Sequence, residues 1–514
     1  MQETIEAIDE RLRHLLAVAP ESAPPAAEFE ILADSLLGQE FATFSQLVDR
    51  ADLLRAALHR VGWPRRSPPT RESPYLKAWG KLIKLYTKAT QHPAAVPSSP
   101  YCALAHERQS WCLLRMMLIF WFELTRVPDT LWGGLHQALL RAERANVANR
   151  RVDDGLFGTP LRLSCREVHH AAALIHLANP NALPMSMLPR VVTFALELAT
   201  YAQFVPPEWL DRIDDRYGID LAGNSPPIPA LALADAKMLR LYDAGALIPK
   251  VHMRLAQTGL STDERLLLET LSQRWTGEPP KRQEPREPSN EGLQVVSDWP
   301  AIYFYFTGRA FEPPTAVSVR RTFEEAQRIQ LFGGTVSDVD LTEREREKNE
   351  LLYSPHLTQW DAMDRSPKGW RIRRSGARSE LTRWPPGRLL LVRKHPKTYG
   401  GMLTRVRWRQ ATFDGEIHLG LEQIPGIPRP TAVQHFPVVG APPTPWYPAF
   451  WFPDTSRGDE GTHRLLAPLE IGTEAKLLNL WVEHKTRGAR VQEVLEKGED
   501  YLILTFFWID PVII

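Results

Sequence analysis

The most constraining feature of this 514-residue sequence is a change in the spacing of its apolar residues across one charged break. Residues 276–288 are rich in Pro, Glu, Lys and Arg and contain no apolar side chain. Before the break apolar residues recur at helical spacing, and from about residue 352 they alternate with a period of two. We therefore predict a multidomain α + β protein, with an irregular all-helical N-terminal domain and a small antiparallel β-barrel in the C-terminal half.

The helical half is expected to span residues 1–275, beginning with an amphipathic helix that carries Ile5, Ile8 and Leu12 on one face. Two later helices open with capping boxes, Ser164-x-x-Glu167 and Ser261-x-x-Glu264. No fixed period links the helical segments, so a repeat array is not predicted. After the first helix, helical patterns cover 27–62, 74–90, 104–126, 129–147, 164–178, 186–204, 232–245 and 261–275.

The second half is expected to contain a linker, a connector and two β regions. The linker covers 276–298, and the mixed α/β connector covers 299–350, with a strand-like aromatic run at 301–306 and a possible helix at 319–332. Turn signals at Pro386-Gly387 and Asp414-Gly415 separate alternating strands and predict a closed barrel over 351–436. Residues 437–514 form a second β subdomain, which either closes separately or completes the first barrel.

Composition limits the class of protein. Hydrophobic residues make up 43% and charged residues 24% of the chain, as in globular proteins. The three cysteines lack metal-ligand spacing and indicate a reducing compartment. The acidic N-terminus does not resemble a signal peptide, and the most apolar run, 116–122, is too short for a bilayer span. A cytoplasmic protein is the expectation.

Positive charge is concentrated in one β-patterned stretch of an otherwise balanced chain. The whole sequence has 62 basic and 61 acidic residues, but 361–410 has fourteen basic residues against three acidic ones. Such a stretch indicates either an anionic partner or the solvated exterior of a barrel. The basic residues are Arg365, Lys368, Arg371, Arg373, Arg374, Arg378, Arg383, Arg388, Arg393, Lys394, Lys397, Arg405, Arg407 and Arg409.

A D-x-S-x-x-G run, formed by Asp364, Ser366 and Gly369, opens this basic stretch. Its spacing suits a tight turn between two strands, in which Asp and Ser cap backbone amides or contact a base. The glycine is expected to supply a backbone conformation that other residues avoid.

Other constellations are less informative. Cys165, His169 and His176 share a helical stripe, but the outer two are about 16 Å apart along a helix axis, so all three cannot hold one ion. The sequence contains no nucleophile elbow, Walker loop, zinc-protease motif or dinucleotide fingerprint. We therefore expect a protein that is not an enzyme and needs no metal.

The D-x-S-x-x-G turn inside a basic barrel resembles PilZ domains, and the long helical region before it resembles the long proteobacterial members of that family. The resemblance implies a small β-barrel that binds cyclic di-GMP, with Asp364, Ser366 and Gly369 at a guanine. It also implies an R-x-x-x-R arm before the barrel that binds phosphates. Arg344-x-x-x-Lys348, with Arg346 between, is the nearest candidate, and Arg320-Arg321 is another source of charge. Lysine replaces the second arginine and loses its planar geometry. Arg371 and Arg373 follow the turn as further candidates.

Three functions remain open at this stage. The first is a cyclic di-GMP receptor whose helical domain binds an unidentified protein partner and controls pili, motility or polysaccharide, as the resemblance implies. The second is an adaptor whose barrel has lost the ligand and binds protein instead. The third is nucleic-acid binding through the arginines of 365–409, which would weaken steeply with salt.

Overall fold

The fold is described from a computed structural model. It describes residues 5–17, 26–41, 43–61, 73–154, 161–210, 215–276, 278–279, 285–314, 338–394, 398–412, 414–435, 444–454, 461–483 and 485–509. The possible helix at 319–332, Arg320-Arg321 and Lys397 lie outside these ranges. The chain forms two compact units, Met1–Arg282 with Ala411–Asp414, and Gln283–Gln410 with Gly415–Ile514.

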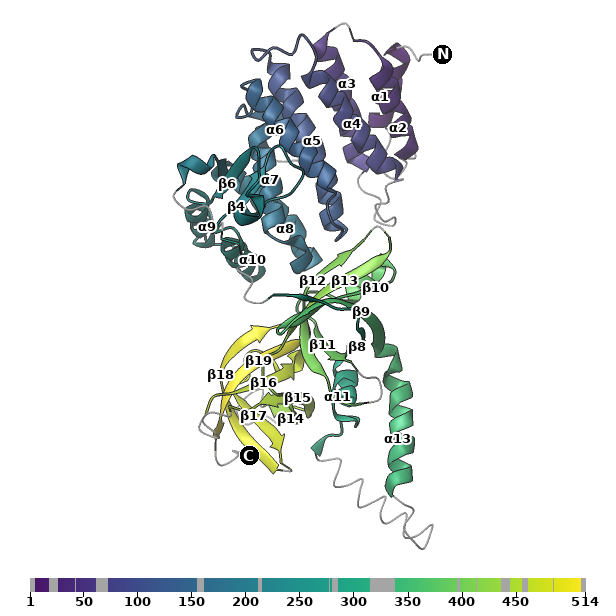
Figure 1. Ribbon diagram of the computed structural model, residues 1–514, viewed down its shortest axis with the longest axis vertical. Coiled ribbons are helices and arrows are strands. Elements are labelled where there is room, and N and C mark those ends of the chain that lie inside the picture. The colour runs from purple at the N-terminus through teal and green to yellow at the C-terminus, as the bar shows by residue number, and fades with distance from the viewer. Residues whose placement is uncertain are drawn as a thin grey trace. The chain divides into compact units, whose positions relative to one another are not determined.

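The first unit is mainly helical, as the apolar spacing predicted (Figure 1). Both predicted capping boxes are present, since the hydroxyls of Ser164 and Ser261 accept from the amides of Glu167 and Glu264. No helix in the described part of the chain combines the length and hydropathy needed to cross a bilayer. The helices are α1 (Ile5–Ala17), α2 (Ala26–Gly38), α3 (Phe44–Val61), α4 (Pro74–Thr90), α5 (Pro100–Phe122), α6 (Asp129–Arg144), α7 (Cys165–Leu177), α8 (Leu188–Leu198), α9 (Leu247–Leu255) and α10 (Thr262–Arg274).

The prediction that this unit is entirely helical was wrong, because it also contains two small sheets. Strands β1 (Val152–Asp154) and β2 (Leu161–Leu163) form a pair, and a four-stranded sheet has the order β3-β6-β4-β5. The helix expected over 232–245 is replaced by a short 3₁₀ turn, Ala230–Leu233, and by β6, which pairs with both β3 and β4. Strand pairing thus overrides the helix propensity of the Ala/Leu run. The four strands are β3 (Gln203–Val205), β4 (Tyr217–Asp220), β5 (Ile228–Pro229) and β6 (Leu239–Asp243).

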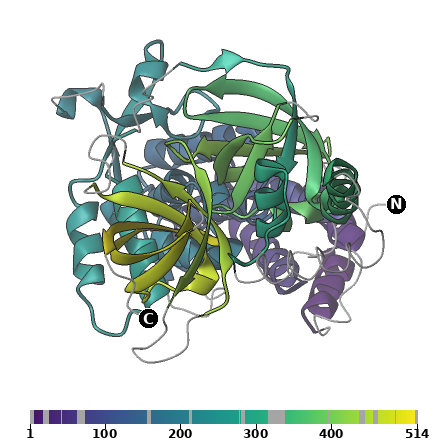
Figure 2. The same ribbon diagram turned by 90° about the horizontal axis from the view of Figure 1, so that it is seen from below.

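The second unit contains two closed six-stranded β-barrels. We name them barrel 1, with the ring β8-β9-β10-β13-β12-β11, and barrel 2, with the ring β14-β15-β16-β19-β18-β17. Both can be followed in Figure 2, barrel 1 in green and barrel 2 in yellow. If each barrel's strands are numbered in chain order, both rings read 1-2-3-6-5-4. Residues 437–514 therefore do not complete the first barrel.

Barrel 1 starts before the expected range of 351–436. Its first strand, β8, lies inside the expected linker, while β14 of that range belongs to barrel 2. The strands of barrel 1 are β8 (Gly292–Val296), β9 (Leu357–Ser366), β10 (Gly369–Ser375), β11 (Leu389–Arg393), β12 (Met402–Ala411) and β13 (Glu416–Gln423), with the short β7 (Glu287–Pro288) added alongside β9. Those of barrel 2 are β14 (Arg429–His435), β15 (Tyr447–Phe452), β16 (His463–Pro468), β17 (Leu477–Val482), β18 (Lys485–Lys497) and β19 (Tyr501–Ile509).

Two further helices lie between β8 and β9 in sequence, α11 (Trp299–Thr307) and α13 (Asp338–Tyr353). The strand-like interpretation of 301–306 was wrong, because these residues belong to α11. Pro300 stands in its first turn and Gly308, at φ 79°, ends it in the left-handed conformation. α11 shares one buried apolar cluster with both barrels, including Phe304, Leu389 and Phe450.

Candidate ligand-binding site

The D-x-S-x-x-G run forms the hairpin between β9 and β10, as its spacing predicted. Ser366 pairs with Gly369 across the turn, and Asp364 pairs with Arg371 two residues further from it. The carbonyl of Lys368, in the turn itself, accepts a hydrogen bond from the amide of Gln423 at 2.8 Å. The turn of the hairpin is therefore held by a hydrogen bond from Gln423, the last residue of β13.

Gly369 is needed for a different reason from the one expected. Its φ is not in the positive range that favours glycine. A Cβ at this position would instead overlap the carbonyl oxygen of Leu421, and would lie 3.0 Å from its carbonyl carbon and 3.2 Å from the Cα of Glu422. The glycine therefore lets β10 approach the backbone of β13 closely.

The carboxylate of Asp364 lies between two arginines. Arg286 donates from Nη1 to Oδ1 at 2.7 Å, and Nη1 of Arg371 is 3.8 Å from Oδ2. The Asp364 side chain is 19% exposed, whereas those of Arg286 and Arg371 are 39% and 37% exposed. Two cations around one carboxylate leave a local positive excess, with part of each guanidinium open to solvent. Such a group of side chains can bind a phosphate or lie flat against a base.

Arg286 was not among the residues selected from the sequence, although its signal was present there. Arg282-x-x-x-Arg286 has the R-x-x-x-R spacing and stands six residues before the first strand of barrel 1. It was overlooked because it falls in the charged stretch that marks the domain boundary. Arg282 itself lies outside the described residues.

The structure does not place the other candidate arm beside Asp364 in any of the described contacts. Arg344, Arg346 and Lys348 are exposed on α13. Arg346 lies over the ring of Tyr399, with Cζ 4.3 Å from its centroid, and donates from Nε to its hydroxyl at 2.9 Å. That hydroxyl donates in turn to Glu350 at 2.6 Å. Arg346 thus has a structural partner within the chain.

The basic stretch does not form a single cationic surface, which corrects the impression that its composition gives. Arg373 lies 3.5 Å from Glu416, Arg407 lies 3.0 Å from Glu422, and Arg374 pairs with Glu380. Arg393 and Arg409 are buried. Glu380 inside the stretch, and Glu416 and Glu422 outside it, therefore neutralise part of the excess, because antiparallel pairing brings β13 beside the basic strands.

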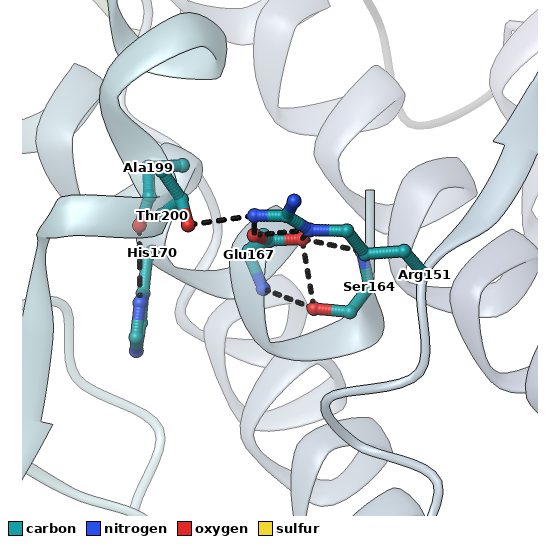
Figure 3. A network of polar contacts seen from close by, with 6 residues as sticks. All are labelled: Arg151, Ser164, Glu167, His170, Ala199 and Thr200. Atoms are coloured by element: carbon teal, nitrogen blue, oxygen red, sulfur yellow. Dashed lines mark hydrogen bonds and ion pairs between the residues drawn. The ribbon is translucent and has the colours of Figure 1, made fainter. Parts of the chain in front are cut away.

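A second candidate is a polar pocket of about 810 Å³ in the helical unit. Arg151 donates from Nε to both oxygens of Glu167, at 2.9 and 3.1 Å, and from Nη2 to the hydroxyl of Thr200 at 2.7 Å (Figure 3). Burial would raise the pKa of Glu167, but the hydrogen bonds from Arg151 and Ser164 outweigh it and hold that pKa below its ordinary value. Arg151, Ser164, Glu167 and Thr200 therefore form a hydrogen-bonded network in the wall of the pocket.

His170 lines the same pocket, where its Nδ1 lies 3.4 Å from the carbonyl oxygen of Ala199 (Figure 3). Burial lowers the pKa of His170 to about 4, and Arg166 adds to the effect, so the ring is neutral near pH 7. The neighbouring Cys165 contacts Ser110 at 3.0 Å, and His169 contacts His136 at 3.0 Å. Cys165 and His169 are therefore buried residues that contact different partners in the core.

Part of the helical unit matches a known protein family. Residues 39–208 match the family described as the N-terminal domain of the cyclic-di-GMP receptor FimW. The match covers helices α3 to α8 and all but two of the residues that line the polar pocket. No curated protein matches the chain.

Proposed function

We propose that this chain is a non-catalytic cyclic di-GMP receptor, in which barrel 1 binds the nucleotide and the helical unit binds a protein partner. The observation that carries the proposal is the contact of Arg286 with Asp364 beside the D-x-S-x-x-G hairpin. Two further observations support it. The helical region matches the N-terminal domain of a cyclic di-GMP receptor, and barrel 1 is a six-stranded barrel of the kind that the PilZ resemblance implies.

The proposed chemistry follows from the charges around the hairpin. Cyclic di-GMP carries two phosphates and two guanines, so it needs cations, hydrogen-bond acceptors and flat surfaces. Arg286 and Arg371 would contact phosphate or stack on a base. Asp364 would hold Arg286 in position and accept from a guanine, with the Ser366 hydroxyl beside it. An arm that an anion orders is also a natural switch for the output.

Isothermal titration of the full chain with cyclic di-GMP tests this proposal. We expect saturable binding that Arg286→Ala and Asp364→Ala each weaken about ten- to a hundredfold, since one charge-assisted contact contributes roughly 1.5–3 kcal/mol. Arg344→Ala is the matched control, because it removes an exposed arginine of α13 and should leave the affinity unchanged. Weakening by Arg344→Ala but not by Arg286→Ala would move the phosphate arm to α13.

An adaptor that no longer binds the ligand is the second candidate. The observation that favours it is that Arg373, Arg374 and Arg407 of the basic stretch already pair with acids of the chain. No heat at tens of micromolar nucleotide would support the adaptor and reject the receptor. The two functions also differ in the cell, where the partner of a receptor, but not of an adaptor, should change with the nucleotide. Control of pili, motility or polysaccharide from the cytoplasm is part of the proposed receptor function.

A further inference from the structure

Barrel 2 repeats the strand order of barrel 1, so the two barrels have topologically equivalent ends. In barrel 1 the candidate site lies where the second strand turns into the third, between β9 and β10. The equivalent end of barrel 2 is formed by the end of β15, the start of β16 and the strand ends beside them. We call it the hairpin end of barrel 2. It contains Arg429, Trp451, Val482, Glu483, Lys485, Arg487 and Trp508.

Two neighbouring tryptophans, flanked by two arginines, lie across this end. Cζ of Arg429, the first residue of β14, lies 5.4 Å from the ring centroid of Trp451. Trp451 packs edge to face against Trp508, with centroids 5.6 Å apart. Cζ of Arg487 lies 4.1 Å from the ring of Trp508. Four side chains from β14, β15, β18 and β19 thus form one continuous row.

A pocket of about 320 Å³ opens at this row, lined by Trp451, Val482, Glu483, Lys485 and Arg487. Its size is at the lower end of the range for small-molecule sites, which suits one nucleotide unit more than two. Among the described residues of the row and its pocket, Arg429, Lys485 and Arg487 are positively charged and Glu483 is negatively charged. The site therefore favours an anion.

The two indoles also present hydrogen-bond donors. Trp451 is only 7% exposed, and in the described part of the chain neither its indole N–H nor that of Trp508 has an acceptor. A buried donor without a partner costs free energy that a bound acceptor would recover. Flat rings that lie beside cations suit a planar base better than an alkyl group.

We propose that the hairpin end of barrel 2 is a second nucleotide site, which takes a purine nucleotide through contact of its base with Trp451 and the indole N–H of that residue, and contact of its phosphate with Lys485 and Arg487. The identity of this nucleotide as cyclic di-GMP rests on the proposed function, whereas the site itself does not. The mononucleotide GMP is the alternative ligand, because it also carries a guanine and a phosphate.

The test is isothermal titration of the full chain with cyclic di-GMP and, separately, with GMP. For cyclic di-GMP we expect two binding events in the wild type and one in Arg286→Ala with Asp364→Ala. Adding Arg487→Ala to that background should weaken the remaining event about tenfold or more. Arg490→Ala is the matched control, because Arg490 is exposed on the same strand, β18, and does not line the pocket. Lys485→Ala, at an exposed position, provides a second variant that should fold normally.

Each outcome decides between the sites. If Arg286→Ala with Asp364→Ala removes all binding, the second site is overturned while the proposed function stands. If binding is insensitive to the barrel 1 changes but is lost with Arg487→Ala, the second site stands and the function proposed for barrel 1 fails. Binding of GMP alone that Arg487→Ala weakens would support the second site with a mononucleotide ligand. An absence of binding for both nucleotides overturns both proposals.

Discussion

At the scale of single residues, Gly369 shows how close contact between two backbones can require a glycine at one position of a turn. We expect Gly369→Ala to destabilise the chain by about 1–3 kcal/mol, the usual cost of forcing atoms into a packed site, because the added Cβ would overlap the Leu421 carbonyl. Urea unfolding measures this loss. Gly292→Ala is the control, since no atom lies within 4 Å of a Cβ there. Equal midpoints for the two variants would contradict the explanation.

The same hairpin shows which part of the candidate site could be predicted from the sequence and which part could not. The spacing of Asp364, Ser366 and Gly369 was enough to predict the turn, because turn geometry is local. The partner of Asp364 was not predicted, since Arg286 is 78 residues away and reaches it only because β7 pairs with β9. A motif therefore identified one side of the candidate site, and strand pairing was needed to find the other.

At the scale of secondary structure, α7 buries histidine side chains that must stay neutral. Because burial lowers the pKa of His170 to about 4 in the folded chain, the unfolded chain binds more protons between about pH 6.5 and pH 4. The free energy of unfolding should therefore fall as the pH is lowered through that window. We expect His170→Gln to reduce this pH dependence by up to about 3 kcal/mol.

Urea unfolding followed by circular dichroism between pH 7.5 and pH 4.5 measures the effect. His14→Gln, on the exposed face of α1, is the control and should leave the slope unchanged. The neighbouring charged groups are Arg166, which lowers the pKa of His170, and Glu167, which raises it. A wild-type slope that persists in His170→Gln would assign the acid sensitivity to the other histidines of the unit whose pKa burial lowers, namely His106, His136, His169 and His176.

The secondary-structure elements also show where the spacing of apolar residues alone gives a wrong prediction. The aromatic run at 301–306 has the composition of a strand but forms α11, because apolar side chains are needed all round a helix that packs against two barrels. Alternation along 402–409 predicted β12 correctly, although both faces of that strand carry buried residues, Thr404 and Val406 on one and Leu403 and Arg409 on the other. The spacing of apolar residues distinguishes a helix from a strand when only one side of the element is buried. When the element is buried on all sides, the residues are apolar throughout and this spacing is lost.

At the scale of the whole molecule, the two barrels of the second unit are joined through Asp500. This residue, in the turn before β19 of barrel 2, accepts from the amide of Leu389 of barrel 1 at 2.8 Å, and its own carbonyl accepts from the indole of Trp299 at 2.7 Å. Arg388 lies 3.7 Å from its carboxylate. Burial raises the pKa of Asp500 to about 6, more than the Leu389 amide and Arg388 lower it. The contact between the two barrels therefore includes a carboxyl group that titrates at about pH 6.

The sign of the resulting pH dependence is opposite to that of the histidines. Between about pH 4 and pH 6 the folded chain holds a proton on Asp500 that the unfolded chain has released, so the stabilisation is complete below pH 4 and is lost as the pH rises through about 6. Asp500→Asn keeps an acceptor for Leu389 without the charge. We expect it to stabilise the second unit by about 1–3 kcal/mol at pH 8 and by much less at pH 4.5. Urea unfolding at the two pH values measures the difference, with Glu493→Gln, exposed on β18, as the control. If Asp500→Asn were instead destabilising at pH 8, the contact with Arg388 would outweigh the cost of burying the carboxylate, and the barrels would be held together by an ion pair.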